Sequence, residues 1–155
     1  ATASREKFAR LSEFGVDHPI AYREVDFADA IRELTSGRGV DLVVDSVGGD
    51  TLATLIRTTT ALGCIASCGL AGGAQLNTTV YPFILRGINL IGINSSATLR
   101  ELRLVVWQRI ATDLAPRHLA RIATQTLPFE DLPGAFDAYL AGGVTGRTVV
   151  RIGGG

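Results

Sequence analysis

Four residues near the N-terminus have the types and spacing to bind a phosphate group. Ser4, Arg5 and Lys7 lie at the expected start of a helix, and Tyr22 ends the next expected strand, where it can lie beside them. Backbone amides at a helix start, together with two cations, attract an anion. The alternative interpretation is a solvated, basic first helical turn without a ligand.

Two glycine-containing loops can bring backbone amides against a cofactor. Val47 and Gly48 follow one largely apolar run, and Gly69 and Leu70 follow another. Ligands of open parallel sheets bind outside the carboxyl ends of the strands, which is where both loops are expected. The alternative is that the glycines only shape the two turns.

A polar segment after a third apolar run adds Asn94 and Ser95 to these candidates. The segment can bind the edge of a carboxamide, and an ordinary polar turn is the alternative. We identify no catalytic residue, because Cys68 has no adjacent histidine or cation that would stabilise a thiolate. Two cysteines and two distant histidines make a poor zinc set, so no metal site is predicted.

These candidates depend on a strand–helix–strand unit within residues 39–73. Apolar runs at 40–44 and 64–68 predict two strands. Apolar residues at helical spacing over 52–56 predict a helix between them, with Asp50 as its N-cap. Strands that are apolar without alternation suit a parallel sheet that is covered on both faces.

The flanking segments extend the same alternation of strands and helices. Upstream, the expected elements are a strand end at 1–3, a helix at 8–14, a strand at 19–22 and a helix capped by Asp26. Downstream, they are a strand at 89–94, a helix opened by a capping box from Thr98 to Glu101, a strand at 122–127, a helix at 131–140 and a strand at 146–152. This order predicts an α/β fold with right-handed crossovers between parallel strands.

Length and composition favour one well-filled domain in the cytoplasm. The 155 residues carry fifteen basic and fifteen acidic side chains, so binding to nucleic acid or to an acidic membrane is not expected. No apolar run reaches the roughly eighteen residues of a membrane span. Cys64 and Cys68 diverge along one expected strand, so they are not expected to pair, and a reducing compartment fits.

Within a dinucleotide-binding fold, the cationic candidates indicate which nicotinamide cofactor would bind. An acidic residue after the second strand selects NAD, whereas cations there accommodate the 2′-phosphate of NADP. Ser4 and Arg5 occupy that place, with no acid before Glu6. The sequence therefore predicts NADPH as the cofactor.

The chain resembles the zinc-independent medium-chain dehydrogenase/reductases through the run CGLAGGAQLNTTVYPFILRGINLIGINS, from Cys68 to Ser95. It is most similar to the branch of quinone oxidoreductases and acrylyl-CoA reductase. Further segments occur in that family's order: ATASREK, YREVDFADAI, GVDLVVDSVGGDTL and GRTVV. The resemblance implies a partial Rossmann-like, doubly wound parallel sheet and NADPH-dependent reduction of an activated C=C bond or a quinone by hydride transfer.

The resemblance also implies roles for the candidate residues. The 2′-phosphate would be held by Ser4, Arg5, Lys7 and Tyr22. The path from adenosine to nicotinamide would be lined by Val47, Gly48, Gly69, Leu70, Asn94 and Ser95. The implied substrate is a small molecule, an enoyl thioester or a quinone.

Family members carry a substrate domain, a first strand, a glycine-rich turn and a first helix ahead of the point where this sequence begins. The sequence therefore resembles the C-terminal half of an enzyme that lacks the first βα unit, and catalysis by this half alone is not expected. We interpret residues 1–121 as the cofactor-binding portion. Residues 122–155 are interpreted as a return segment toward a missing substrate domain.

Two other interpretations remain. A non-catalytic assembly module is the first, because the strand at 89–94 is short, apolar and near the expected sheet edge, where backbone groups can pair with another chain. In the resembling family this strand commonly forms the dimer contact, which implies a homodimer. The second is a flavodoxin-like signalling or mononucleotide module, which would need acidic metal ligands or a phosphate loop that the sequence does not show.

Overall fold

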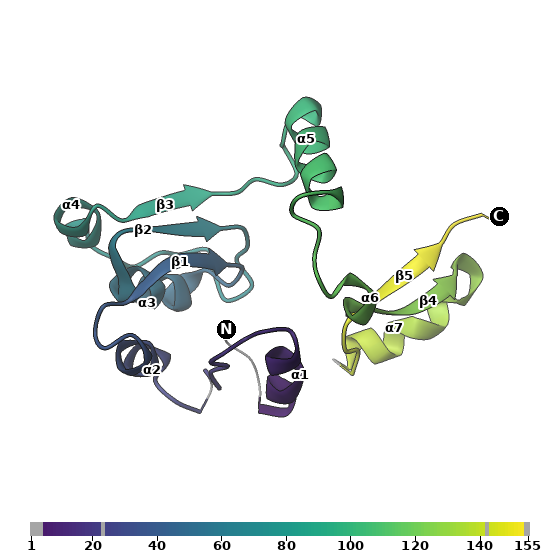
Figure 1. Cartoon of the computed structure of the whole chain (residues 1–155), viewed down its shortest axis with the longest axis horizontal. Coiled ribbons are helices and arrows are strands. Elements are labelled where there is room, and N and C mark those ends of the chain that lie inside the picture. Colours follow the sequence, from purple (N-terminus) through teal and green to yellow (C-terminus); the bar gives the residue numbers. More distant parts are fainter. Residues whose placement is uncertain (1–4, 23, 142, 154–155) are drawn as a thin grey trace. The chain divides into compact units, whose positions relative to one another are not determined.

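The computed structural model describes residues 5–22, 24–141 and 143–153 of the chain (Figure 1). The chain divides into two compact units, of which the first ends at Thr98 and the second begins at Leu99. Each unit contains a parallel β-sheet. The fold class is therefore α/β with parallel strands, as the sequence predicts.

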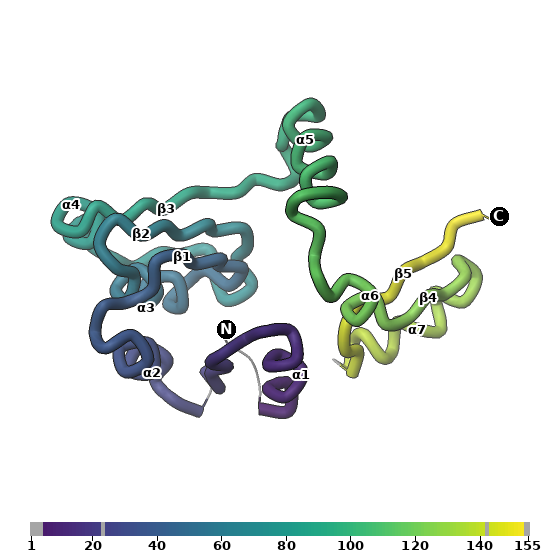
Figure 2. Tube along the Cα trace, viewed as in Figure 1, coloured from purple at the N-terminus to yellow at the C-terminus, as the bar shows by residue number. Residues whose placement is uncertain are grey.

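The sheet of the first unit consists of β1 (Val40–Asp45), β2 (Thr59–Ser67) and β3 (Asn89–Gly92), in that order. Both pairs are parallel. The helices of this unit are η1 (Arg5–Lys7), α1 (Phe8–Glu13), α2 (Phe27–Leu34), α3 (Gly49–Thr58) and α4 (Tyr81–Arg86). The backbone trace in Figure 2 runs from β1 through α3 into β2, which is the predicted strand–helix–strand unit.

Helix α3 buries its apolar stripe against one face of this sheet. Leu52 and Ile56 lie one turn apart and pack with Val43 and Ile65 in the core, where Ile56 and Ile65 are completely buried. Burial of one such side chain contributes about 1.5–3 kcal/mol. On the opposite face, alternate residues of β1 such as Val44 are up to 75% exposed, so the expected cover on both faces is wrong at this strand.

Three helix N-terminal caps were predicted from the sequence, and the structure confirms one of them. Asp26 caps α2 as predicted, because its carboxylate accepts hydrogen bonds from the amides of Ala28 and Asp29 at 2.8 and 3.3 Å. The predicted Asp50 cap is wrong, since α3 begins at Gly49, with Gly48 in the N-cap position and no side-chain cap. The predicted capping box is also wrong, because the hydroxyl of Thr98 donates to the carbonyl of Asn94 instead, at 2.9 Å.

The segment before α2 is less regular than predicted. Residues 19–22 do not form a strand, and only Ile20 occupies a β-bridge. Pro19 lacks an N–H, and the amide of Tyr22 turns back to donate to the carbonyl of Ile20 at 3.0 Å, which ends any extended pairing. The strand end expected at 1–3 lies outside the described residues.

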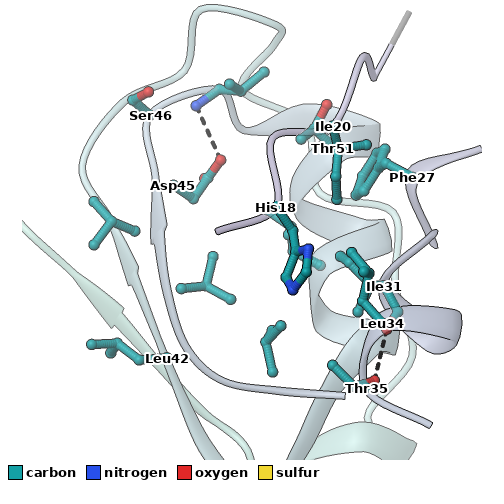
Figure 3. A pocket seen from close by; sticks show the side chains of 15 residues that line it. His18, Ile20, Phe27, Ile31, Leu34, Thr35, Leu42, Asp45, Ser46 and Thr51 are labelled. Carbon is teal, nitrogen blue, oxygen red and sulfur yellow. Dashed lines mark hydrogen bonds between the residues drawn. The ribbon is translucent and has the colours of Figure 1, made fainter. Parts of the chain in front are cut away.

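A groove of about 410 Å³ lies between β1 and α2 (Figure 3). Phe27, Ile31 and Leu34 of α2 form one wall, and residues of β1 such as Leu42 form the other. Among the described strands, β1 is paired only with β2, so its other edge faces this groove. The groove therefore has an open strand edge and an apolar helix face as its two sides.

The second unit pairs β4 (Ala123–Pro128) in parallel with β5 (Arg147–Arg151). Its helices are α5 (Arg100–Ala111), α6 (Leu119–Ile122), η2 (Phe129–Asp131) and α7 (Leu132–Leu140). These elements confirm the predicted order of helix, strand, helix and strand. Most apolar residues of helix α5 are exposed, with Trp107 at 61%.

Candidate functional site

The buried carboxylate of Asp45 organises the loop that follows β1. Asp45 is 2% exposed. Its Oδ1 accepts hydrogen bonds from the amides of Val47 and Gly48 at 3.0 and 3.1 Å, and its Oδ2 accepts one from the Ser67 hydroxyl at 3.2 Å. These two amides are thus directed toward Asp45 within the protein. A molecule bound beside this loop would therefore contact atoms of the loop other than these two amide groups.

The loops after β1 and β2 are joined to each other by their main chains. The amide of Gly72 donates to the carbonyl of Val47 at 2.7 Å, and Gly48 and Gly73 form a parallel bridge. A Cβ atom on Gly48 would lie 2.5 Å from the carbonyl oxygen of Gly73. A Cβ atom on Gly69 would lie 2.5 Å from that of Ser46. The glycines therefore do shape these turns, because the two loops approach too closely for any side chain.

A pocket of about 490 Å³ opens at the carboxyl ends of β2 and β3. Four of the predicted site residues line it, namely Gly69, Leu70, Asn94 and Ser95. The remaining lining residues are Ser67, Cys68, Gly92, Ile93 and Ser96. The volume lies in the range of small-molecule sites, and the lining combines apolar walls with a few polar groups, as such sites do.

The polar groups of this pocket are held in place by local hydrogen bonds. The Oδ1 atom of Asn94 accepts from the amide of Ala97 at 3.0 Å, which leaves the Nδ2 group of Asn94 as a donor for a bound molecule. The amide of Ile93 donates to the carbonyl of Ser67 at 2.8 Å and continues the pairing of β3 with β2. The Cys68 thiol donates to the carbonyl of Asp45 at 3.3 Å.

The N-terminal patch is described only in part, because Ser4 lies outside the described residues. The guanidinium of Arg5 forms an ion pair with the carboxylate of Glu24, two residues after Tyr22. Lys7 is exposed, and Tyr22 is 39% exposed. The structure thus brings Arg5 to the segment that follows Tyr22 and adds a carboxylate that was not among the predicted site residues. The available signal was an acid placed two residues after Tyr22.

The predicted site residues therefore fall into three groups, namely the N-terminal patch, Val47 and Gly48 in the loop after β1, and the residues that line the pocket. None of the described residues of the N-terminal patch, Arg5, Lys7 and Tyr22, lines the pocket. The groove beside β1 is lined by Ile20, which lies two residues before Tyr22 in the sequence, and by Val47 of the loop after β1. Figure 3 shows His18 between the groove's two walls and Asp45 at the end of β1.

The resolved pKa shifts belong to exposed ion pairs outside the pocket. The hydrogen bond from Arg38 lowers the pKa of the Asp41 carboxyl, and that from Arg109 lowers the pKa of Asp113. Within the described ranges, no three His, Cys, Asp or Glu side chains gather as a possible metal site. None of the described helices has both the length and the apolar character needed to cross a bilayer.

A parallel sheet with glycine-containing loops and a pocket at its carboxyl ends defines a Rossmann-like, NAD(P)-binding type of α/β unit. The chain belongs to the family described as zinc-binding dehydrogenase, whose model matches residues 1–112. Cys64 and Cys68 are both free thiols.

Two sequence relatives that are described as an oxidoreductase and a reductase are more than twice the length of this chain. YhfP of Bacillus subtilis, which carries the description of a quinone oxidoreductase, is 35% identical over 98% of this chain and 46% of its own length. The acrylyl-CoA reductase AcuI of Ruegeria pomeroyi is 46% identical over 70% of this chain and 33% of its own length. The chain thus spans less than half of these relatives and corresponds to their C-terminal part.

Solved structures show the same fold. The crystal structure of B. subtilis YhfP with NAD bound has a TM-score of 0.80 at 33% identity, covering 97% of this chain and 45% of that one. That of Escherichia coli YhdH with bound NADPH has a TM-score of 0.76 at 31% identity, covering 99% of this chain and 46% of that one. Both neighbours hold a nicotinamide cofactor, and the two cofactors differ in the 2′-phosphate.

Proposed function

We propose that this chain is the nucleotide-binding C-terminal part of an NADPH-dependent oxidoreductase that reduces an activated C=C bond or a quinone. The observation that carries the proposal is the pocket at the carboxyl ends of β2 and β3, lined by Gly69, Leu70, Asn94 and Ser95. Such a cofactor supplies the hydride, and the protein supplies binding and orientation. Substrate classes come from the relatives, which are described as a quinone oxidoreductase and an acrylyl-CoA reductase.

In this proposal the pocket takes the nicotinamide end of the cofactor. The Nδ2 donor of Asn94, whose Oδ1 is held by the Ala97 amide, would bind the carbonyl oxygen of the carboxamide. Leu70 and Ile93 would contact the faces of the ring, because they supply the apolar surface of the lining. Ser95 lies beside Asn94 and would bind the same carboxamide edge.

The remaining candidates would bind the adenosine side. Val47 and Gly48 lie in the loop that is bonded to the Gly69–Gly73 segment, so a cofactor leaving the pocket along the carboxyl edge passes them. Ser4, Arg5, Lys7 and Tyr22 would hold the 2′-phosphate. The 1–121 and 122–155 portions keep their proposed roles as cofactor-binding part and return segment, with a cytoplasmic, zinc-independent protein as the context.

Cofactor titration and turnover test this proposal together. We expect NADPH to bind, and Asn94→Leu to weaken NADPH binding about tenfold, since a hydrogen bond in a site of this kind contributes roughly 0.5–1.5 kcal/mol. Asn89→Leu is the matched control, because Asn89 is exposed on β3 and does not line the pocket. Turnover of enoyl thioesters and quinones would then be measured with and without the preceding segment of the polypeptide. Absence of cofactor binding and of turnover in both forms would end the enzyme proposal.

An assembly module is the second candidate function, and the open outer edge of β3 favours it. Strand β3 is the last of the three strands, and Ile91 and Ile93 are 49% and 46% exposed. Pairing of two β3 edges across a twofold axis would make the homodimer, with Asn89–Asn94 as the contact. Sedimentation at tens of micromolar tests this, with Ile91→Lys expected to give monomers. A wild-type monomer at that concentration would contradict it.

A further inference from the structure

The N-terminal patch contains an acid and a base that reach each other across nineteen positions of the chain. The Arg5 guanidinium on η1 pairs with the Glu24 carboxylate in the turn that precedes α2. The two side chains are 65% and 48% exposed. Both therefore remain accessible to a ligand while they are paired. The pair lies in the segment to which the proposed function assigns the 2′ position of the adenosine ribose.

A carboxylate at this place changes what the patch can recognise. An acid at the ribose accepts hydrogen bonds from a 2′-hydroxyl and favours NAD, whereas cations favour the 2′-phosphate of NADP. Arg5 supplies the cation, and Glu24 supplies a charge of the opposite sign in direct contact with it. A bound 2′-phosphate would have to share Arg5 with Glu24, and the negative charge of Glu24 would repel the phosphate. A 2′-hydroxyl meets no such repulsion and can donate to the carboxylate.

We propose that Glu24 is a specificity-determining residue that lowers the preference of this site for a 2′-phosphate over a 2′-hydroxyl. The proposal rests on the proposed cofactor function. It assigns opposite roles to two residues of one ion pair: Arg5 favours NADPH, and Glu24 favours NADH. The relative affinity for the two cofactors then depends on the charge of Glu24.

Coulomb's law sets the size of the effect. For a carboxylate and a doubly charged phosphate about 6 Å apart in water, the repulsion corresponds to roughly tenfold in binding at low salt. Screening at physiological ionic strength reduces this to about threefold. The preference should therefore change more at low salt than at high salt, which a change in hydrogen bonding alone would not produce.

The experiment compares the wild-type chain with Glu24→Gln and measures the dissociation constants of NADPH and NADH by fluorescence titration at two salt concentrations. Glutamine keeps an acceptor oxygen for Arg5 and removes only the charge. Asp29→Asn is the matched control, because Asp29 forms an exposed ion pair with Arg32 on α2 and its change alters the net charge equally. We expect Glu24→Gln to shift the preference toward NADPH about tenfold at low salt and about threefold at physiological salt.

The outcomes distinguish a failure of the role given to Glu24 from a failure of the proposed cofactor function. If both cofactors bind and the shift in Glu24→Gln equals that in Asp29→Asn, or is absent, the role of Glu24 is refuted while the cofactor function stands. If neither cofactor binds to any of the three proteins, with or without the preceding segment of the polypeptide, the proposed function fails and the inference fails with it. A preference that moves toward NADH in Glu24→Gln would show that Glu24 acts by orienting Arg5, which overturns the inference.

Discussion

Arg86 at the end of α4 is expected to be the most important single side chain for the stability of the first unit. Its Nη1 donates to the carbonyls of Thr59 and Arg57 at 2.7 and 3.1 Å, and its Nη2 donates to that of Ile56 at 2.9 Å. These oxygens belong to the last turn of α3 and the start of β2. The last carbonyls of a helix lack partners within the helix and carry its partial negative charge, so a half-buried cation satisfies both needs.

Removal of this guanidinium should be costly. Each hydrogen bond to a charged group contributes about 1.5–3 kcal/mol, and three bonds to one group are not additive. We expect Arg86→Ala to lower the free energy of unfolding by about 2–4 kcal/mol, out of a total of roughly 5–15 kcal/mol for a domain. Arg86→Lys keeps the charge but loses the planar fork, so it should recover less than half of that loss.

Urea denaturation followed by circular dichroism measures the effect, with hydrogen exchange of the β2 amides as a local readout. Arg32→Ala is the control, because Arg32 pairs with Asp29 on the exposed surface of α2 and should cost less than about 0.5 kcal/mol. If Arg86→Ala is no more destabilising than Arg32→Ala, the structural role given to these three bonds is refuted.

Three further predictions concern the loops and an exposed ion pair. Gly69→Ala should destabilise the first unit by about 1–3 kcal/mol, since the new Cβ would lie 2.5 Å from the Ser46 carbonyl oxygen; the control Gly134→Ala on α7, where no atom lies within 4 Å, should be neutral or stabilising by up to about 1 kcal/mol in the same urea assay. Asp45→Asn should cost about 2–3 kcal/mol and speed amide exchange at Val47 and Gly48, and unchanged exchange would contradict the role of the carboxylate. The hydrogen bond from Arg38 lowers the folded-state pKa of Asp41 below 3.8, so this pair stabilises the fold above that pH and the contribution is lost as the pH falls; an NMR titration should show the midpoint return toward 3.8 in Arg38→Gln.

The central strand–helix–strand unit could be predicted from sequence because local and tertiary signals agree there. Apolar runs without alternation mark β1 and β2, and the spacing of Leu52 and Ile56 marks the buried face of α3. The same holds for Asp26, whose capping bonds are local. Positions of the pocket-lining residues followed from topology alone, because parallel strands end at one edge.

The parts that were missed depend on contacts between distant segments. Asp50 and Thr98 are residue types that favour helix caps, yet α3 begins after Gly48 and α5 begins after Leu99, both without a side-chain cap. The strand at 19–22 was overpredicted because a strand needs a neighbour, and the turn at Tyr22 removes it. The acid two residues after Tyr22 is visible in the sequence, but its contact with Arg5 spans nineteen positions, so no local pattern shows that the two side chains meet.

The two ends of the proposed cofactor site are built differently, and this decides how each responds to change. The loops beside the pocket are held by main-chain bonds and a buried carboxylate within residues 45–73, so their geometry depends on glycines and on Asp45 rather than on exposed charges. The end of the site that is proposed to bind the 2′-phosphate consists of exposed side chains, of which Arg5 is paired with the carboxylate of Glu24. Salt and surface charge should therefore alter the choice between NADPH and NADH while leaving the pocket intact. Substitutions at Gly69 or Asp45 should weaken the binding of both cofactors alike, since the nicotinamide end is common to the two.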